Sequence, residues 1–325
     1  MCYPKKGVSI HVENTAIHSI IAFFCLIQYI NTMEKQLTWP VEASSADTNK
    51  AFHWNQPASN LCLDFHGDPV SANLVVFSDG NHHMALEACC KLFLNTHPDV
   101  IDIFYVTTPP KVILESVLQG GLFLGNLHIN VKPHVFISPA NVLDKLVNQG
   151  KIFSHQAFAR SRDNVLLVKK GNPKKIISTR DLLRDDVTLT ISNPVTETAS
   201  YNVYKQTLLN VAQEQSLDIE AFNTLISSES KTTVFGESIH HREVPQTLYS
   251  SRADVAVVYY HLALRYTRIF PNDFEIIEIP SATNVYTDYR IGLMNNSGVW
   301  GQKFLNFMTS KTALEIYQQH GLQPA

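Results

Sequence analysis

The feature that most constrains this chain is a repeated alternation of short apolar runs with helical patterns. From residue 61 onward, runs such as "LVVF" (74–77) and "HVFIS" (134–138) have the length of buried strands, and each precedes a segment with helical periodicity. Alternating strands and helices form a mostly parallel sheet that helices cover on both faces. We therefore expect an α/β fold.

The alternation occurs in two successive sets, which predicts two lobes. Strands are expected at 74–77, 100–106, 134–138, 164–170, 188–192, 255–260, 274–280 and 288–294. Helices are expected at 82–97, 110–119, 140–149, 200–215 and 299–322, the last one broken near 309–310. Proteins of this class bind ligands beyond the carboxyl ends of their strands. A ligand cleft is therefore expected between the lobes.

Composition narrows the class of protein. A chain of 325 residues with 45% hydrophobic and 17% charged residues is typical of an ordinary globular protein. Its net charge of -3 provides no general attraction to nucleic acid. The five cysteines form no C-x-x-C pair, and Cys89 and Cys90 are expected to be small buried residues. We expect no cofactor, no resident metal and a monomer.

The N-terminal 60 residues are expected to form an apolar segment followed by a polar linker. Lys5 and Lys6 precede "AIHSIIAFFCLIQYI" (16–30), which resembles an export signal but lacks a cleavage site directly after it. If this run is a signal, the processed protein begins between residues 31 and 47 and is periplasmic or otherwise extracytoplasmic. A start at Met33 would instead make the protein cytoplasmic.

Four common motifs of catalytic and nucleotide-binding sites do not occur in the sequence. There is no G-x-S-x-G, no G-x-x-x-x-G-K-[ST], no G-x-G-x-x-G and no H-E-x-x-H. What recurs is a strand that ends in hydroxyl, amide or glycine residues and runs directly into a helix, at 78–81, 107–110 and 196–200. Helix N-termini leave N–H groups unpaired and carry a partial positive charge, so several aimed at one point bind an anion. Each could also be a plain helix cap.

From about residue 72 to the end, the chain resembles the substrate-binding proteins of ABC transporters with the two-lobed type II periplasmic fold. The resemblance is strongest to the molybdate- and tungstate-binding branch. It rests on "VFSDGNH" (76–82), "HVFISP" (134–139), "NVLLVKKGNP" (164–173), "SSRADVAVVYYHLA" (250–263) and "FLNFMTSKTALEIYQQHGL" (304–322). The segment 120–133 is an addition to the family pattern.

The resemblance implies a function and a set of positions. Asn81 stands where a ligand-binding serine is usual, Thr107 and Thr108 take the second serine loop, and Tyr259 takes the place of the ligand tyrosine. It also implies an ABC permease and ATPase as partners. The first lobe would span 61–163 and 283–325, and the second 164–282. Two crossings, near 158–166 and 280–290, would act as hinges.

Two histidine pairs, 82–83 and 240–241, fall beside these loops. They could contact an anion, bind a transition metal, or lie in solvated loops, and the sequence leaves all three open. The candidate ligand-binding residues are Ser78, Asn81, His82, Thr107, Thr108, Ser200, Tyr201, His241 and Tyr259. The expected function is capture of a small oxyanion for an ABC transporter. The alternatives are an enzyme on the same fold and an intracellular ligand sensor.

Overall fold

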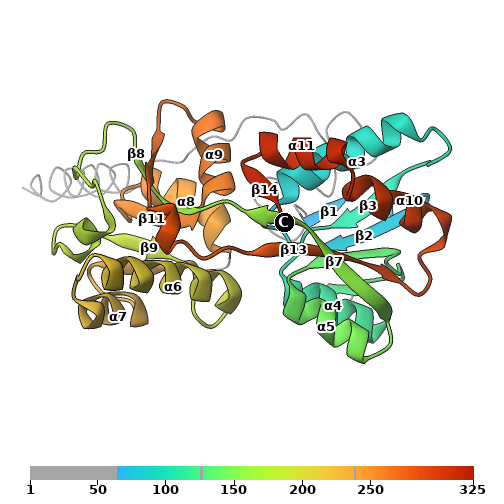
Figure 1. The fold of residues 1–325 in the computed structure, drawn as a ribbon, viewed down its shortest axis with the longest axis horizontal. Helices are drawn as coiled ribbons and strands as arrows, with labels where there is room; N and C mark the ends of the chain where they lie inside the picture. The colour runs from blue at the N-terminus through green and yellow to red at the C-terminus, as the bar shows by residue number, and fades with distance from the viewer. Residues whose placement is uncertain (1–63, 125–126, 238) are drawn as a thin grey trace, which may run out of the picture. The chain divides into compact units, whose positions relative to one another are not determined.

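The computed structural model describes residues 64–325, apart from 125–126 and 238. The apolar run 16–30, the alternative start at Met33 and the polar linker lie outside the described residues. The described part of the chain contains a seven-stranded sheet, a five-stranded sheet and a two-stranded hairpin. We call the seven-stranded sheet and its helices the first lobe, and the five-stranded sheet and its helices the second lobe (Figure 1).

The first lobe contains strands from both ends of the described chain. Its sheet has the order β1-β3-β2-β6-β13-β7-β14. The bounds are β1 (Phe65–His66), β2 (Leu74–Ser78), β3 (Ile103–Val106), β6 (Val135–Ser138), β7 (Ile152–Ser161), β13 (Asp288–Met294) and β14 (Leu322–Pro324). The helices are α3 (His83–Thr96), α4 (Pro110–Gln119), α5 (Ala140–Asn148), α10 (Gly298–Met308) and α11 (Lys311–Gln319). Figure 1 shows α3, α10 and α11 on one face of this sheet and α4 and α5 on the other.

Strand β2 lies at the centre of this sheet and is buried along its whole length. Leu74 and Val76 belong to the hydrophobic cluster that includes residues of α3, α10 and α11. Val75 and Phe77 belong to the cluster on the α4 and α5 side. Successive side chains of a strand point to opposite faces. A continuous apolar run is therefore what a strand covered on both faces requires.

The second lobe is built from one continuous stretch of chain. Its sheet has the order β10-β9-β11-β8-β12. The strands are β8 (Asn164–Lys169), β9 (Leu189–Ile191), β10 (Thr233–Phe235), β11 (Val255–Tyr259) and β12 (Phe274–Glu278). The helices are α6 (Thr198–Glu214), α7 (Ile219–Ser227), α8 (His240–Tyr249) and α9 (Tyr260–Ile269), with two 3-10 segments, η2 (Thr179–Leu183) and η3 (Ser281–Thr283). In Figure 1, α6 and α7 cover one face of the sheet and α8 and α9 the other.

Two strand connections join the lobes, and they run side by side. The chain leaves the first sheet after Ser161, enters the second at Asn164, and returns between β12 and β13. The backbone N–H of Ser161 donates to Thr287 O at 2.8 Å, and that of Asn164 donates to Asn284 Oδ1 at 2.6 Å. The crossings therefore lie within the two segments predicted as hinges, and the hinge motion stays a prediction.

The expectation of mostly parallel sheets is corrected to mixed sheets. Strands β3, β2 and β6 are parallel, and so are β10, β9 and β11. The crossing strands β7, β8, β12 and β13 pair antiparallel with their neighbours, because β8 and β13 begin at the crossings, where the strands beside them end. Several bounds also differ by a few residues. Strand β3 begins at Ile103 rather than at residue 100, and the last helix ends at Gln319. Residues 322–324, expected as helix or tail, form β14, which pairs with β7. The added segment 120–133 contains the hairpin of β4 (Leu122–Leu124) and β5 (Leu127–Ile129).

Candidate functional site

The three predicted strand-to-helix junctions are present in the structure. Strand β2 runs into α3, β3 into α4, and β9 into α6. At none of these helices does the N-cap side chain make a capping hydrogen bond, so their polar loops are not plain caps. Glu197, the N-cap residue of α6, instead accepts a hydrogen bond from the backbone N–H of His240 at 2.8 Å, at the start of α8. A carboxylate of the protein thus already lies at one helix N-terminus, where negative charge is favoured.

Among the polar contacts between the lobes in the described residues, three lie near the first junction. Arg242 of α8 pairs with the carboxylate of Asp64, and Arg265 of α9 contacts the ring of His83. His261 Nε2 lies 2.9 Å from the backbone oxygen of Asn81. We call these six residues the seam: Asp64, Asn81 and His83 from the first lobe, and Arg242, His261 and Arg265 from the second.

Gly80 allows close approach at the seam. A Cβ atom built at this position would lie 2.5 Å from the backbone oxygen of Thr107 and 3.9 Å from Arg242 Nη2. The first distance is far shorter than a carbon–oxygen contact permits, so only glycine fits without movement of the backbone. The loops after β2 and β3 therefore lie close together, near the guanidinium group of Arg242.

Asp64 is a buried carboxylate with few partners. Its side chain is 2% exposed, and besides Arg242 it accepts a long hydrogen bond of 3.5 Å from Thr107 Oγ1. That hydroxyl also lies 3.1 Å from His66 Nε2. Burial raises the pKa of Asp64 to about 6, while the charge of Arg242 opposes the rise. The Asp64 carboxylate is therefore held in its charged form chiefly by Arg242.

The histidines around the seam are neutral. Burial lowers the pKa of His66, His240 and His261 to about 3 and that of His83 to about 4, and it lowers the pKa of His241 well below its usual value. Arg242 adds to the lowering at His66, His83 and His241. These rings can donate or accept hydrogen bonds at neutral pH, but they bring no positive charge. The cations of the seam are its arginines.

His82 lies inside the first lobe rather than in a solvated loop. Its side chain is fully buried, and its ring is stacked at a tilt on Tyr289 with centroids 4.5 Å apart. Nδ1 lies 2.8 Å from the hydroxyl of Tyr317, and Nε2 lies 3.1 Å from Ser78 Oγ and 2.9 Å from Asp79 Oδ1. All of these partners belong to the first lobe. Of this histidine pair, His83 is the member that reaches the second lobe.

The side chains of the predicted contact residues Ser200, Tyr201 and Tyr259 in the second lobe have different hydrogen-bond partners. Tyr201 is buried and its hydroxyl donates to Ile226 O at 2.9 Å, within the second lobe. Ser200 Oγ donates to Ser192 Oγ at 2.9 Å. The hydroxyl of Tyr259 lies 2.9 Å from Thr287 Oγ1, in the returning crossing. Of these three side chains, that of Tyr259 contacts the seam, because its ring stacks on the ring of His261 with centroids 5.3 Å apart.

Two predicted residues have buried polar atoms without hydrogen-bond partners in the described part of the chain. They are His241 Nε2 and Thr108 Oγ1. His241 is 9% exposed, and Tyr266 donates a hydrogen bond to its backbone oxygen. The neighbouring rings of His240 and His261 also have one unpartnered nitrogen each. A buried polar atom without a partner is costly, so such atoms are candidates for ligand contacts.

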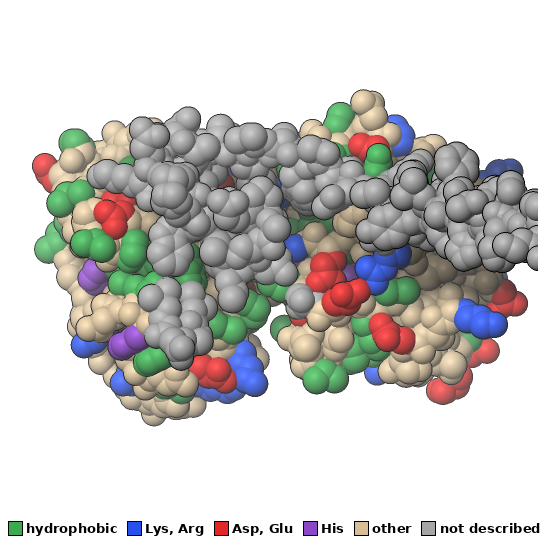
Figure 2. Space-filling view, turned by 180° about the vertical axis from the view of Figure 1, so that it is seen from behind, with side chains coloured by type: hydrophobic (Ala, Val, Ile, Leu, Met, Phe, Trp, Pro, Cys, Tyr) green, Lys and Arg blue, Asp and Glu red, His purple; other side chains and the backbone are tan. Residues whose placement is uncertain are grey.

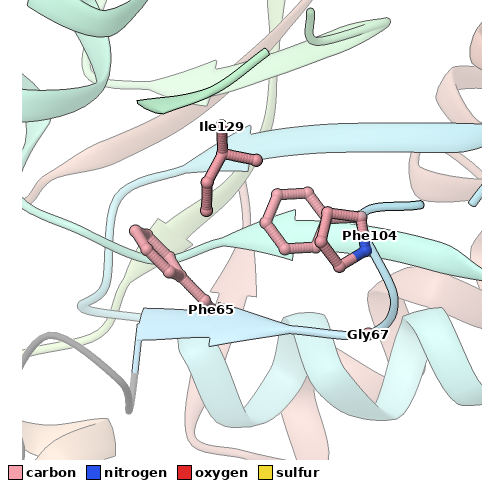
Figure 3. A pocket seen from close by; sticks show the side chains of 5 residues that line it. Phe65, Gly67, Phe104 and Ile129 are labelled. Carbon is pink, nitrogen blue, oxygen red and sulfur yellow. The ribbon is translucent and has the colours of Figure 1, made fainter. Parts of the chain in front are cut away.

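Other candidate sites in the described residues are less suited to binding a charged ligand. Within residues 64–325, gaps excepted, no three His, Cys, Asp or Glu side chains could hold a metal ion together. Cys89 and Cys90 are buried free thiols whose pKa is raised by burial, to about 12 for Cys89. Figure 3 shows a hollow in the first lobe lined by Phe65, Gly67, Pro69, Phe104 and Ile129. Its apolar lining does not suit an anion.

Surface charge is dispersed. On the face shown in Figure 2, acidic and basic side chains are scattered over the described surface without a large patch of one sign. None of the helices in the described residues is both long enough and apolar enough to cross a bilayer. Attraction of an anion must therefore come from local groups such as those of the seam.

The fold and the seam define a two-lobed α/β binding protein, as expected from the resemblance. The chain belongs to the family of bacterial extracellular solute-binding proteins, whose model matches residues 74–323. No curated protein sequence matches the chain. The two-lobed fold is also that of solved binding proteins, described next.

Three solved structures illustrate the range of ligands on this fold. The periplasmic molybdate-binding protein of Azotobacter vinelandii is 15% identical, with a TM-score of 0.55 over 77% of this chain and 98% of that one. The sulfate-binding protein SubI of Mycobacterium tuberculosis is 17% identical, with a TM-score of 0.57 over 78% and 86%. Iron-bound HitA of Pseudomonas aeruginosa is 13% identical, with a TM-score of 0.53 over 78% and 84%. At these identities the likeness shows the fold, and the ligand is a separate question.

Sequence reasoning missed most of the seam. Asp64, His83, Arg242, His261 and Arg265 were absent from the predicted ligand contacts, although His83 and Arg242 adjoin predicted residues. The available signal was the position of the two arginines in the sequence. Arg242 directly follows the predicted ligand residue His241, and Arg265 follows Tyr259 by fewer than two helical turns. Without the tertiary structure, nothing distinguishes these arginines from solvated ones.

Proposed function

We propose that this protein captures a small oxyanion, of the molybdate or tungstate kind, at the seam between its lobes. The observation that carries the proposal is the position of Arg242. Its guanidinium group lies next to Gly80 and Thr107, where the loops after β2 and β3 come together. Arginine presents several N–H donors in a planar fork that matches the oxygen atoms of an anion. The proposal departs from the expected site of neutral donors by adding positive charge.

The remaining contacts would come from neutral groups. We propose Asn81, Thr107, Thr108 and His241 as ligand contacts, because they lie at or beside the seam and two of them have unpartnered polar atoms. The predicted contacts of Ser78, His82, Ser200, Tyr201 and Tyr259 are weaker proposals, because their polar atoms already have partners within the protein.

Membership of the solute-binding family supports a role in delivering the ligand to a transporter. We propose that the protein acts outside the cytoplasm as a monomer and passes its ligand to an ABC permease and ATPase. The lobes, at 61–163 with 283–325 and at 164–282, would close on the ligand by bending at the two crossings. Similarity to extracellular solute-binding proteins supports the location and the class of partner.

A thermal-shift screen tests the ligand class. Molybdate, tungstate, sulfate and phosphate would be compared with neutral sugars and divalent metal ions at equal ionic strength. A ligand at 100 times its Kd stabilises the folded state by about 2.7 kcal/mol, which raises Tm by roughly 4–5 °C in a protein of this size. We expect a shift with at least one oxyanion and none with sugars. A shift with sugars alone would overturn the proposal.

A further inference from the structure

An anion bound at the seam and the carboxylate of Asp64 require the same partner. Arg242 reaches across from α8 and pairs with Asp64, which directly precedes β1. An incoming anion must therefore share this guanidinium group or displace Asp64 from it. We propose that the Asp64 carboxylate competes with the anion for Arg242, an inference that rests on the proposed function. This competition sets the affinity for the anion and couples anion binding to the uptake of a proton.

If the anion takes Arg242 from Asp64, the carboxylate keeps one weak hydrogen-bond partner. Its carboxylate is 2% exposed, and its other hydrogen bond, from Thr107 Oγ1, is 3.5 Å long. If Arg242 turns to the ligand, Asp64 stays buried beside a second negative charge. An unpaired buried carboxylate is strongly disfavoured, and it becomes neutral by binding a proton. Anion binding should then take up one proton.

The surroundings of Asp64 make it the group that titrates near neutral pH. Arg242 faces it from α8, Thr107 from the loop after β3, and His66 approaches through Thr107 from β1. His83, from α3, interacts with both His66 and Arg242. The pKa of Asp64 is raised to about 6, whereas the pKa of His66 is lowered to about 3 and that of His83 to about 4. Between pH 6 and pH 8, Asp64 is thus the group whose protonation the anion can change.

The direction of the pH effect follows from these charges. Above pH 6 the carboxylate is ionised and opposes a bound anion. As the pH falls from 8 toward 6, the cost of neutralising Asp64 decreases, and the affinity for the anion rises. For an anion whose own charge is constant in this range, such as sulfate, a linkage of one proton changes Kd about tenfold per pH unit.

The test uses Asp64→Asn, which keeps the shape of the side chain and removes its charge. Asp102→Asn is the matched control, because Asp102 is a partly buried carboxylate of the same lobe that accepts hydrogen bonds from Asp68 N at 2.7 Å and Ile103 N at 2.9 Å, away from the seam. Sulfate and molybdate are titrated calorimetrically into the full chain and both variants at pH 6, 7 and 8. We expect Asp64→Asn to bind at least about tenfold more tightly than the unaltered protein at pH 8, with a nearly constant Kd across the range. Asp102→Asn should behave like the unaltered protein.

A second measurement needs no variant to fold. Titration of the unaltered protein at pH 8 in two buffers with different ionisation enthalpies gives the number of protons taken up, which we expect to be close to one. Anion binding with no proton uptake, or with equal affinity in Asp64→Asn, overturns the role of Asp64 and leaves the proposed function intact. An anion that binds only Asp64→Asn supports the competition. If neither protein binds any oxyanion, the proposed function fails and this inference fails with it.

Discussion

The two lobes bring opposite kinds of chemistry to the seam. The first lobe contributes a buried carboxylate, a neutral imidazole and backbone oxygens, at Asp64, His83 and Asn81. The second contributes two guanidinium groups, at Arg242 and Arg265, on helices α8 and α9. Two of the three predicted ligand loops, at 78–81 and 107–110, thus lie in the lobe that does not supply the positive charge. Under the proposed function, the first lobe would shape the anion site and the second lobe would supply its positive charge.

The largest effect expected from this comparison is on stability at acid pH, because both lobes bury neutral histidines. His66, His83, His240 and His261 have a folded-state pKa of about 3 to 4, below the unfolded value of about 6.5. The unfolded chain therefore binds more protons below pH 6.5, and the stability present above that pH is lost as the pH falls toward 4. Each histidine contributes about 1.4 kcal/mol per pH unit, partly offset by Asp64, whose raised pKa has the opposite sign.

Urea unfolding at pH 7.5, 6.5, 5.5 and 5.0 measures this loss. We expect the free energy of unfolding to fall by several kcal/mol between pH 6.5 and pH 5.0. His240→Asn should flatten the dependence, whereas substitution of His128, which is exposed in β5, should not. A stability that stays constant over this range would show that the rings are not held neutral.

The second effect concerns the charge of the second lobe. Arg242→Ala should weaken oxyanion binding by roughly 100-fold or more, because loss of one partner of a buried charge pair costs about 2–5 kcal/mol. Arg268→Ala is the control, since Arg268 is an exposed arginine of α9 that donates to Gln319 O at 3.0 Å. Calorimetric titration makes the comparison. If both variants bind like the unaltered protein, the charge does not come from the seam.

The third effect separates the two histidines that the sequence singled out. His82→Ala should lower the free energy of unfolding by about 2–4 kcal/mol, because it leaves a cavity and unpaired groups in the first lobe. His241→Ala should instead lower affinity about 10- to 100-fold with little change in stability, if its unpartnered Nε2 contacts the ligand. Melting curves and titrations of the two variants would contradict this division if the losses were exchanged.

The smallest effect is expected at the tyrosines of the second lobe. Tyr259→Phe removes the hydroxyl that lies 2.9 Å from Thr287 Oγ1, and Tyr201→Phe removes the donor to Ile226 O. Each should cost about 1 kcal/mol of stability and change the Kd less than threefold. A loss of tenfold or more in Tyr259→Phe alone would restore the family role of this tyrosine.

The fold was largely predictable because its signals are local. The bounds of α4 and β13 were predicted residue for residue, since a proline starts the helix and an apolar run marks the strand. Strand β7 was missed because its ten residues show no continuous apolar run, since Ser154, His155 and Gln156 interrupt it. Helix α8 was missed because Pro245 lies inside it and its first residues are histidines.

The site was less predictable because its key contacts are not local. Asp64 and Arg242 are 178 residues apart, and neither residue differs in sequence context from a solvated one. The junction at 78–81 could be found because a strand, a glycine and a helix start follow one another in the chain. Which histidine of each pair faces the other lobe depends on helix rotation and on packing against Tyr289 and Tyr317, which a single sequence does not specify.

The order of the strands along the chain also determines the order in which the lobes can be completed during synthesis. Every strand of the five-stranded sheet lies between residues 164 and 278, so that sheet can form as soon as this stretch has left the ribosome. The seven-stranded sheet needs β13 between β6 and β7, and β13 is made after the whole second lobe. Until then, β6 and β7 each have an open edge that another chain could pair with. A nascent chain that stops before residue 288 would thus hold a complete second lobe and a first lobe open to aggregation.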